Sequence, residues 1–428
     1  MSPPESQTPR EFALLVVKRL REAGYEALWA GGCVRDQLLG LQPKDYDVAT
    51  SATPDQVRHV FGRRKTLAIG AAFGVITVMG PRQAGQIEVA TFRQDAEYSD
   101  GRHPDSVTFS SPEEDAKRRD FTINGLFCDP LKDRVIDYVG GERDLRAGCV
   151  RAIGDPQKRF HEDKLRLLRA VRFTATFNFH LDPETFDAIQ ENAGRIVLVS
   201  SERIAAEMRK ILQIPSRRLG CELLLKTTLL SYILPEADPT SGDRRQASTI
   251  WNRTLNILES LPQSCFSTAL TVLIRELPNA QISPSDALDR IAQRWKLSNE
   301  EIRKTSWFLS HESTLRAASK VPWPQLQRVL VHPDSEQLVT LSEMIEQELT
   351  GKKKQTAYCR SKMSLPAQIF NPSPLLTGND LIDLGIPPGK RYQTILEKVR
   401  DAQLNQEIST KGEALKLARS VWESRRDQ

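Results

Sequence analysis

Two aspartates separated by a single residue, Asp45 and Asp47, have the types and spacing needed for metal-dependent chemistry. They flank Tyr46 at the start of a predicted strand, and side chains two residues apart on a strand project from the same face. Two carboxylates on one face suit a pair of Mg²⁺ ions that bridges the phosphates of a nucleotide. Taken alone, such a pair is more often part of a solvated turn.

Glu88 is a further candidate, because it lies between apolar neighbours in the predicted strand 87–92. It is either a third carboxylate of the metal site, on a neighbouring strand, or a residue on a solvated strand face. The pattern favours neither interpretation over the other.

A glycine pair upstream, Gly31 and Gly32, strengthens the metal-site interpretation. The pair lies between a predicted strand and a predicted helix, and Arg35 follows one turn into that helix. Glycine lets the backbone approach a ligand closely, and a helix N-terminus attracts phosphate. Together with the aspartates a dozen residues later, these residues predict a triphosphate site beside a metal site.

A second basic cluster, Arg118 and Arg119, is followed by Asp120 and Asn124. The two arginines offer ten guanidinium donors, which suit triphosphate oxygens. Asp120 is expected to accept from ribose hydroxyls and so to favour ribonucleotides, and Asn124 to bind ribose or phosphate. An isolated Arg-Arg-Asp sequence is more often a surface charge cluster.

Asp163 and Arg166 are three residues apart in a predicted helix over 159–176 and would therefore share a face. Together they present acceptors beside donors, which matches the amino group and ring nitrogen of both cytosine and adenine. Uracil and guanine reverse this polarity and would leave buried groups unpaired, at about 1–3 kcal/mol each. Taken alone, these residues favour the alternative of an ordinary ion pair within the helix, including one between Glu162 and Arg166.

Around these residues the chain divides into an α/β part and a helical part. A helix predicted over 11–23, which Gly24 ends, is followed by strand-like segments at 27–30, 46–49, 74–79, 87–92, 107–109 and 135–137. From about residue 156 helical patterns dominate, over 159–176, 183–193, 201–212, 219–230 and 249–261. The polar segment 240–245 is a candidate inter-domain loop. The basic segment 351–362 is a second candidate boundary.

Composition limits the class of protein. The 428 residues are 39% hydrophobic and 27% charged, typical of a globular protein, and no apolar run is long enough to span a membrane. Six cysteines with no CxxC pair favour reduced thiols and a cytoplasmic location. The net charge of +5 is compatible with a polyanionic partner without demanding one.

Five segments in chain order resemble the motifs of class II CCA-adding enzymes and bacterial poly(A) polymerases. They are LWAGGCVRDQLLGLQPKDYDVAT (28–50), RRDFTIN (118–124), DYVGGERDL (137–145), EDKLRLLRAVRF (162–173) and ERIAAEMRKIL (202–212). The resemblance implies an α+β fold, in which a polymerase-β-like nucleotidyltransferase head with a small mixed sheet precedes an all-helical neck, body and tail. The implied divisions are a disordered tail (1–10), head (11–150), neck (151–220), body (221–355) and a tRNA-contacting tail (356–428).

The resemblance also implies an activity. The enzyme would add C, C and A to the 3′ end of tRNA from CTP and ATP, without a template, by two-Mg²⁺ nucleotidyl transfer. Asp45 and Asp47 would hold the metal, and Glu88 would join them as a catalytic carboxylate. The nucleotide would be bound by Gly31, Gly32, Arg35, Arg118, Arg119, Asp120, Asn124, Asp163 and Arg166.

Two positions in the nucleotidyltransferase half depart from the family pattern. His103 stands where a second arginine is common, in a segment (91–109) that helps related enzymes switch from C to A. Gly125 stands where alanine is usual. Neither change is expected to abolish activity.

The helical half resembles, more faintly, an HD-type domain that has lost its metal ligands. Arg253, Arg275 and Glu276 occupy the aligned positions, and arginine cannot ligate a metal; His311 and His332 are too few for a dinuclear site. We expect a structural or RNA-binding domain without phosphohydrolase activity. Around the junction of body and tail, phosphate contacts are expected from Lys352, Lys353, Lys354, Tyr358 and Arg360, although each is more simply part of a solvated charged surface.

Three other functions stay open. Bacterial poly(A) polymerases share the head but carry two basic residues after a glycine where this chain has Gly70, Ala71, Ala72 and Phe73, which favours CCA addition. An enzyme that adds only CC or only A would keep all five motifs. An inactive tRNA-binding protein is disfavoured because the acidic and basic site residues are intact. The sequence does not indicate an oligomeric state.

Overall fold

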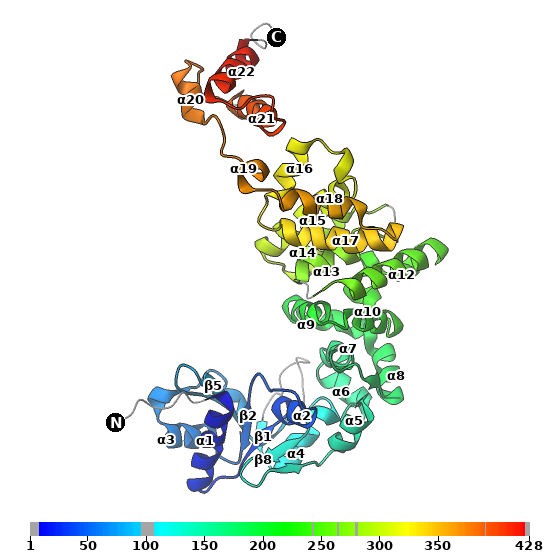
Figure 1. Cartoon of the computed structure of the whole chain (residues 1–428). Coiled ribbons are helices and arrows are strands. Elements are labelled where there is room, and N and C mark those ends of the chain that lie inside the picture. The colour runs from blue at the N-terminus through cyan, green and yellow to red at the C-terminus, as the bar shows by residue number, and fades with distance from the viewer. Residues whose placement is uncertain are drawn as a thin grey trace. The chain divides into compact units, whose positions relative to one another are not determined.

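The computed structural model describes residues 8–95, 107–241, 244–262, 265–278, 281–389 and 391–423. The chain forms two compact units (Figure 1). The first comprises Met1–Ser241 with Arg294–Lys296, and the second Gly242–Gln293 with Leu297–Gln428. The first division falls within the predicted loop 240–245. The segment containing His103 lies outside the described residues.

A seven-stranded mixed sheet forms the centre of the first unit, in the order β3-β4-β5-β2-β1-β8-β9. The pair β2 and β5 is parallel and the other described pairs of this sheet are antiparallel. The strands are β1 (Ala27–Ala30), β2 (Asp47–Thr50), β3 (Thr66–Leu67), β4 (Val75–Met79), β5 (Gln86–Thr91), β8 (Phe127–Asp129) and β9 (Arg134–Ile136). The predicted α+β head is thereby confirmed, and its central strand β2 carries Asp47.

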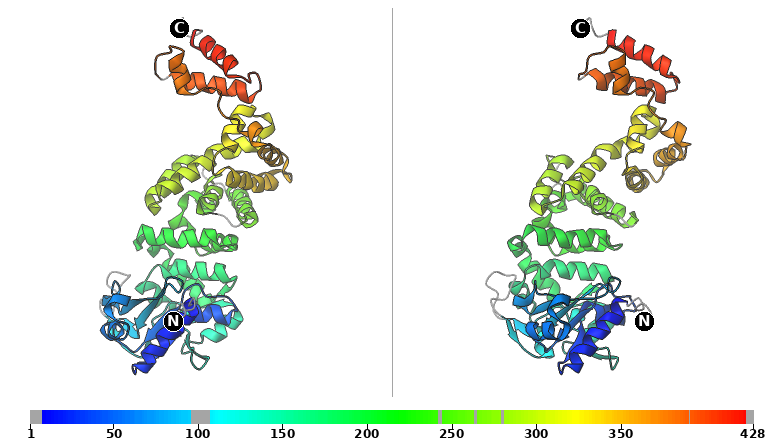
Figure 2. Two further views of the ribbon diagram at one scale, coloured as in Figure 1. Left: turned by 60° about the vertical axis from the view of Figure 1, so that its left-hand side comes forward. Right: turned by 90° about the vertical axis from the view of Figure 1, so that its left-hand side faces the viewer.

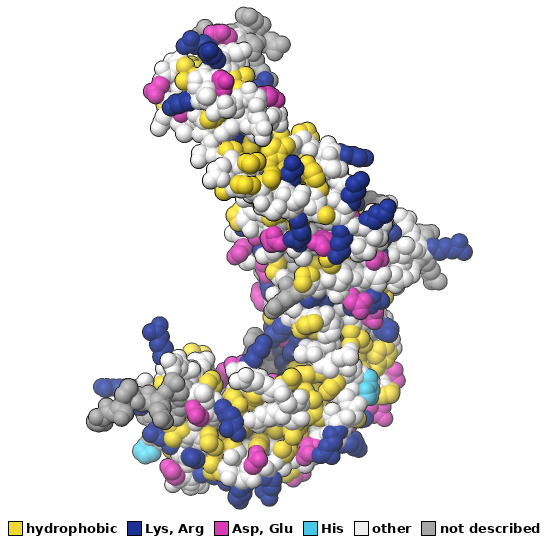
Figure 3. Space-filling view, in the orientation of Figure 1, with side chains coloured by type: hydrophobic (Ala, Val, Ile, Leu, Met, Phe, Trp, Pro, Cys, Tyr) yellow, Lys and Arg dark blue, Asp and Glu magenta, His cyan; other side chains and the backbone are white. Residues whose placement is uncertain are grey.

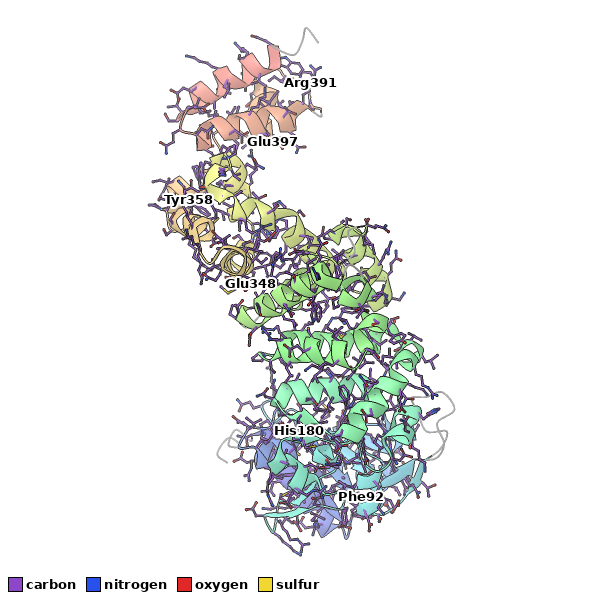
Figure 4. All side chains as sticks on the ribbon, turned by 90° about the vertical axis from the view of Figure 1, so that its right-hand side faces the viewer. Phe92, His180, Glu348, Tyr358, Arg391 and Glu397 are labelled. Carbon is purple, nitrogen blue, oxygen red and sulfur yellow. The ribbon has the colours of Figure 1, made fainter. Side chains whose placement is uncertain are left out.

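Short helices surround this sheet (Figure 1). The first, α1 (Pro9–Glu22), starts with a capping box at Thr8 and buries Phe12, Val16 and Leu20. It ends before Gly24, whose φ of +86° suits glycine. The others are α2 (Gly32–Leu38), α3 (Pro54–Phe61), α4 (Pro112–Lys117) and α5 (Gly141–Ala147), with the hairpin β6 (Arg93–Asp95) and β7 (Val107–Phe109). Phe92, labelled in Figure 4, is buried edge-on to Phe127 in the core.

Helices and one short parallel strand pair complete the first unit. They are β10 (Cys149–Val150), α6 (Pro156–Glu162), α7 (Arg166–Phe177), β11 (His180–Leu181), α8 (Pro183–Asn192), α9 (Ser201–Gln213), α10 (Arg217–Lys226) and α11 (Leu229–Ile233). Figure 2 shows α7 and α9 (green) as successive layers of this unit. The apolar faces of both helices are buried, which fixes their polar residues on the opposite faces.

Two helices predicted as continuous are interrupted. The prediction over 159–176 is wrong at Asp163, whose backbone is extended (φ −135°) and whose carboxylate accepts from the N–H of Leu165, so that a new helix starts at Arg166. The prediction over 219–230 is wrong at Thr228, which adopts a left-handed conformation (φ +59°) between α10 and α11. In the first case a local hydrogen bond from the backbone to the Asp163 side chain competes with the helical hydrogen bonds, which periodicity alone does not reveal.

The second unit is helical in its described part. Its helices are α12 (Arg244–Ser260), α13 (Phe266–Ile274), α14 (Pro284–Trp295, which extends into the first unit), α15 (Asn299–Arg316), α16 (Trp323–Leu330), α17 (Ser335–Thr350), α18 (Lys354–Met363), α19 (Ala367–Phe370), α20 (Gly378–Asp383), α21 (Arg391–Leu404) and α22 (Lys411–Glu423). The last three enclose a small core of their own around Leu381, Ile395 and Ala418. No helix in the described ranges is long and apolar enough to cross a membrane.

The basic segment 351–362 comprises the turn after α17 and most of α18, and these two helices form a helical hairpin. Gly351 ends α17 with a φ of +68°, and Glu346 of α17 accepts from the backbone N–H groups of Gln355 and Thr356 at the start of α18. Arg360 pairs with Glu343 of α17. Figure 3 shows basic and acidic side chains interspersed over α15, α17 and α18, as expected for a surface whose charges pair locally.

Candidate active site

Asp45 and Asp47 lie on the same face at the edge of a cavity of about 780 Å³. Asp47 begins β2, and Asp45 precedes that strand by two residues. Tyr46 between them is buried edge-on against Trp29, with ring centroids 5.0 Å apart. Because one aromatic ring is anchored in the core, the two flanking carboxylates project together into the cavity, as the alternation predicted.

Glu88 lies on β5 directly opposite Asp47 in the parallel register. Burial and repulsion by Glu88 together raise the pKa of Asp47 to about 6, with Arg119 opposing and Asp45 adding to the rise. The Asp47 side chain is exposed, but it faces the cavity. The concave wall of this cavity displaces much of the water that would otherwise surround the carboxylate. Glu88 therefore acts on Asp47 electrostatically, although it is not among the described residues that line the cavity.

These carboxylates fit a divalent cation that completes its coordination with substrate oxygens. Among the residues that the structure describes, no three His, Cys, Asp or Glu side chains converge into a ready-made metal site. Instead, Arg119 only partly offsets the negative charges of Glu88 and Asp45, which contribute to the raised pKa of Asp47. Magnesium is commonly held by one or two carboxylates together with substrate phosphates, which is the donor set available here.

Gly31 shows why glycine is needed beside the carboxylates. Its φ is +69°, and a Cβ at this position would lie 2.8 Å from Nη1 of Arg119. Gly32 starts α2, as the predicted strand–glycine–helix order requires. The backbone can therefore pass directly over a guanidinium group that lines the same cavity.

Arg118 and Arg119 follow α4 and share one buried carboxylate. Oδ1 of Asp115 accepts from Nε and Nη2 of Arg118 at 2.9 and 2.7 Å, and Oδ2 accepts from Nε and Nη2 of Arg119 at 3.2 and 2.9 Å. Asp115 is 1% exposed and was not identified from the sequence. Its position three and four residues before the arginines is the signal that could have identified it.

Asp120 and Asn124 form a network with two further arginines. Asp120 accepts from the N–H of Phe121, from Nδ2 of Asn124, and from Nε and Nη2 of Arg169. Arg35 donates to Oδ1 of Asn124 at 2.5 Å. Burial would raise the pKa of Asp120, but Arg169 and Asn124 outweigh it and lower that pKa to about 2. Asp120 already has four donors, so a contact to ribose requires one of these bonds to open.

Asp163 and Arg166 both line the cavity, but they are not on one helix. Asp163 accepts from Nη2 of Arg203 on α9 at 2.9 Å. Arg166 pairs with Glu162 at 2.6 Å, which is the ion pair given above as the alternative interpretation, and also donates to the carbonyl of Arg118 at 3.0 Å. The ion pair and the cavity location are compatible, because a guanidinium has five donors.

Several cavity residues were missed by sequence reasoning. They are Phe73, Arg93, Leu165, Arg169, Arg172, Phe173, Arg203 and Lys210. Arg169 follows Arg166 by three residues on α7, and Arg172 follows by three more, so a helical projection would have indicated them. The described lining contains nine basic and four acidic side chains, a balance suited to a polyanionic ligand.

Gly125, the departure from the family pattern next to Asn124, has a packing explanation. A Cβ there would lie 2.6 Å from Cγ2 of Val139 and 3.2 Å from Cδ1 of Ile153. Alanine would thus require Val139 to move. With glycine at this position, the β-branched side chain of Val139 occupies the space that an alanine methyl group would need.

The aligned HD positions in the second unit are occupied by ion pairs. Arg253 bonds Glu276 at 2.8 Å, and Arg275 bonds the same carboxylate at 3.1 Å. His311 and His332 stack on the ring of Trp307, at centroid distances of 5.0 and 4.0 Å. These side chains are thus engaged in pairing and packing.

Comparison with known proteins identifies the family. A CCA-adding enzyme of Lacticaseibacillus paracasei is 34% identical over 396 residues, which covers 92% of this chain and 92% of that protein. The chain belongs to the CCA-adding enzyme family. Three family models match in chain order: the poly A polymerase head domain (27–151), the probable RNA and SrmB-binding site of polymerase A (178–240), and tRNA nucleotidyltransferase domain 2 (277–418).

Solved structures of CCA-adding enzymes share the fold. The Bacillus stearothermophilus CCA-adding enzyme in complex with CTP matches with a TM-score of 0.76 at 27% identity, over 100% of both chains. The Thermotoga maritima CCA-adding enzyme complexed with tRNA_CCA matches with a TM-score of 0.64 at 20% identity, over 97% of this chain and 96% of that one. Enzymes of this nucleotidyltransferase family use a divalent metal.

Proposed function

We propose that the protein adds C, C and A to the 3′ end of tRNA from CTP and ATP with release of pyrophosphate. The observation that carries this proposal is the single cavity lined by the aspartate pair, the basic triphosphate residues and the Asp163–Arg166 pair. The similarity to CCA-adding enzymes along 92% of the chain supports it, as does the CTP-bound relative.

The cavity residues divide the work of the reaction. Arg35, Arg118 and Arg119, with the backbone of Gly31 and Gly32, would hold the triphosphate. When bound by Asp45 and Asp47, Mg²⁺ would activate the RNA 3′-hydroxyl and neutralise charge on the phosphates. Glu88 would keep the electrostatic potential at Asp47 negative. Catalysis would rest on positioning and electrostatics, without a covalent protein intermediate.

Base selection is proposed for Asp163 and Arg166. A carboxylate acceptor beside guanidinium donors matches the amino group and ring nitrogen of cytosine and adenine alike. Arg203 holds the carboxylate of Asp163, and Arg118 and Glu162 hold Arg166. With both side chains fixed, the mismatched polarity of uracil or guanine cannot be relieved by a small rotation. Asp120 and Asn124 would contact the ribose.

The helical parts are proposed to bind the tRNA. We assign head, neck, body and tail to 11–150, 151–220, 221–355 and 356–428, and place the enzyme in the cytoplasm. The matches to an RNA-binding site over 178–240 and a tRNA nucleotidyltransferase domain over 277–418 support this assignment. In the body, the ion-paired positions Arg253, Arg275 and Glu276 would leave a structural or RNA-binding role.

The test uses three tRNA transcripts, ending at the discriminator base, at C and at CC. Each is incubated with Mg²⁺, CTP and ATP, singly and together, and the 3′ end is sequenced. Growth of all three to one CCA end is expected. Stopping at CC, or extension of only the CC-ended transcript, would establish a split activity; long A tails would indicate a poly(A) polymerase; no extension would leave an inactive tRNA-binding protein.

A further inference from the structure

Asp115 is not among the site residues predicted from the sequence, yet it binds both arginines that are proposed to hold the triphosphate. One carboxylate oxygen bonds Arg118 twice and the other bonds Arg119 twice. Two of the five donors of each guanidinium are therefore fixed by a single side chain, and both arginines line the cavity. Asp115 is buried, so water does not compete for these bonds.

Each of the two arginines also makes contacts with residues other than Asp115. Arg119 donates to the carbonyl of Asn124 at 3.3 Å, packs over the ring of Phe127 at 4.9 Å, and lies against Gly31. The backbone carbonyl of Arg118 accepts from Arg166, a base-reading residue. Asp115 is thus the common anchor of a connected set that includes the triphosphate arginines and reaches the base-reading arginine.

The charges are consistent with an anchor that stays ionised. Burial alone would raise the pKa of Asp115, but Arg119 and Arg118 outweigh burial and hold this pKa below its usual value. Two guanidinium groups around one carboxylate leave a local excess of positive charge. That excess faces a cavity whose described lining is mostly basic.

We propose that Asp115 is a positioning residue that sets the orientation of Arg118 and Arg119 for the β- and γ-phosphates of the incoming nucleotide. The proposal rests on the proposed function in that it assumes a nucleoside triphosphate in this cavity. Asp115 does not touch the substrate; it acts through the two arginines. Its effect must therefore depend on the number of phosphates on the ligand.

A purely structural role is the alternative, because Asp115 also accepts from the backbone N–H of Arg93 at 3.4 Å and so joins α4 to β6. Loss of a structural link would weaken all ligands of the cavity alike and lower thermal stability. Loss of arginine orientation would weaken triphosphate and pyrophosphate binding specifically. Comparing CTP with CMP separates the two roles.

The experiment measures dissociation constants of CTP, CMP and pyrophosphate for the full-length protein by titration calorimetry, with thermal unfolding in parallel. For Asp115→Asn, CTP and pyrophosphate binding should weaken roughly 10- to 100-fold, the range for lost bonds to charged groups, while CMP binding changes less than about threefold. Glu114→Gln is the matched control, since Glu114 is a partly exposed neighbour on α4 that pairs with Lys117. The control should bind all three ligands as the unmodified protein does.

Two further variants keep the test decisive. In an Arg118→Met, Arg119→Met background, Asp115→Asn should leave the CTP-to-CMP affinity ratio unchanged, because the groups it positions are absent. Asp115→Glu keeps the charge but shifts the oxygens by one methylene, so a folded Asp115→Glu protein should also lose part of the ratio. It serves as the test if Asp115→Asn does not fold.

An unchanged ratio in folded Asp115→Asn or Asp115→Glu, or a further loss of ratio in the arginine-free background, would overturn the proposal. Absence of CTP binding by the unmodified protein would overturn it as well. Failure of the proposed function gives a different result: the unmodified protein would bind CTP but extend no tRNA, and the ligand comparison would still report on Asp115.

Discussion

At the scale of single residues, the charges around β2 and α7 are the most informative feature. Burial and the repulsion by Glu88 raise the pKa of Asp47 to about 6, whereas Arg169 and Asn124 outweigh burial at Asp120 and lower its pKa to about 2. The two aspartates of one cavity thus differ because burial of Asp47 is not offset by a bonded cation, whereas Asp120 is bonded by Arg169. This contrast fits an incoming cation at Asp47 and a fixed, permanently ionised framework residue at Asp120.

For Asp47→Asn we expect nucleotide addition to fall by roughly 10²–10³-fold or more, as when a group that stabilises the transition state is removed. The metal-free variant should nevertheless be more thermostable than the unmodified protein at pH 8. The folded-state pKa is raised, so ionising Asp47 costs stability as the pH rises from about 4 to about 6, and asparagine avoids this cost. Thermal unfolding in EDTA at pH 5 and pH 8 checks the sign. A variant that melts earlier than the unmodified protein at pH 8 would contradict this electrostatic interpretation.

Arg169→Met should destabilise the protein and make its activity sensitive to pH. Asp120 contributes stability above its unfolded pKa, and this is lost only as the pH falls toward about 2. Without Arg169, the buried carboxylate loses its cation, at about 3–5 kcal/mol for a fully buried pair and less here because Arg169 is one-third exposed. Denaturant unfolding at pH 7 and activity from pH 5.5 to 8 measure both effects.

The control for that variant is Arg146→Met, which breaks an exposed pair with Glu142 and should cost less than about 1 kcal/mol. Equal destabilisation of the two variants would mean that the Asp120–Arg169 pair contributes no more than a surface ion pair.

At the scale of elements, the interruption between α6 and α7 sets the geometry of the two residues proposed for base selection. Asp163 accepts from the N–H of Leu165 in the turn before α7 and also lines the cavity, while Arg166 begins the new helix. On a continuous helix, the side chains of Asp163 and Arg166 would project from the same face of that helix. The extended backbone at Asp163 instead places its carboxylate within reach of Arg203 on α9.

Asp163→Asn should keep the hydrogen bond from the N–H of Leu165, since the amide oxygen of asparagine also accepts, but relax base selection. An amide offers a donor as well as an acceptor, so uracil and guanine no longer leave buried groups unpaired. The preference for CTP and ATP over UTP and GTP should fall by roughly 10- to 100-fold, corresponding to about 1–3 kcal/mol. Single-nucleotide incorporation kinetics with all four nucleotides measure this. Unchanged discrimination in a folded variant would assign base selection elsewhere.

At the scale of the whole molecule, the cavity belongs to the first unit and the basic hairpin α17–α18 belongs to the second. Within this hairpin, Lys353 and Arg360 are bonded to Glu343, and Lys362 lies over the rings of Trp323 and Tyr358, the latter labelled in Figure 4. The expected phosphate contacts of Lys353 and Arg360 therefore compete with ion pairs inside the protein. Lys352 and Lys354 are exposed.

Replacing Lys352 and Lys354 by alanine should weaken tRNA binding and leave the KM for CTP unchanged. Each lost phosphate contact should reduce the slope of log K against log salt by roughly 0.7–0.9. Binding of tRNA measured at several KCl concentrations gives this slope. An unchanged slope would show that these lysines form only a solvated charged surface, the simpler interpretation.

The sequence by itself determined the chemistry of the site and the class of fold. Alternation around Tyr46 places two carboxylates on one face, and glycines at 31 and 32 mark a strand-to-helix turn, because both signals are local and follow from backbone geometry. The six predicted strands match β1, β2, β4, β5, β7 and β9 to within one residue for the same reason, whereas β3, β6, β8, β10 and β11 were not predicted. Motif order along the chain then indicated the family.

Only the tertiary structure decided which side chains support those residues. Arg169 and Arg203 act on Asp120 and Asp163 through contacts that cross 49 and 40 residues of sequence, which local patterning does not encode. The interruption at Asp163 depends on competition between the Asp163 side chain and the helical backbone for hydrogen bonds. Contacts with other elements, such as Arg203 on α9, decide the outcome. Periodicity describes one element at a time, whereas burial and charge pairing depend on several elements meeting.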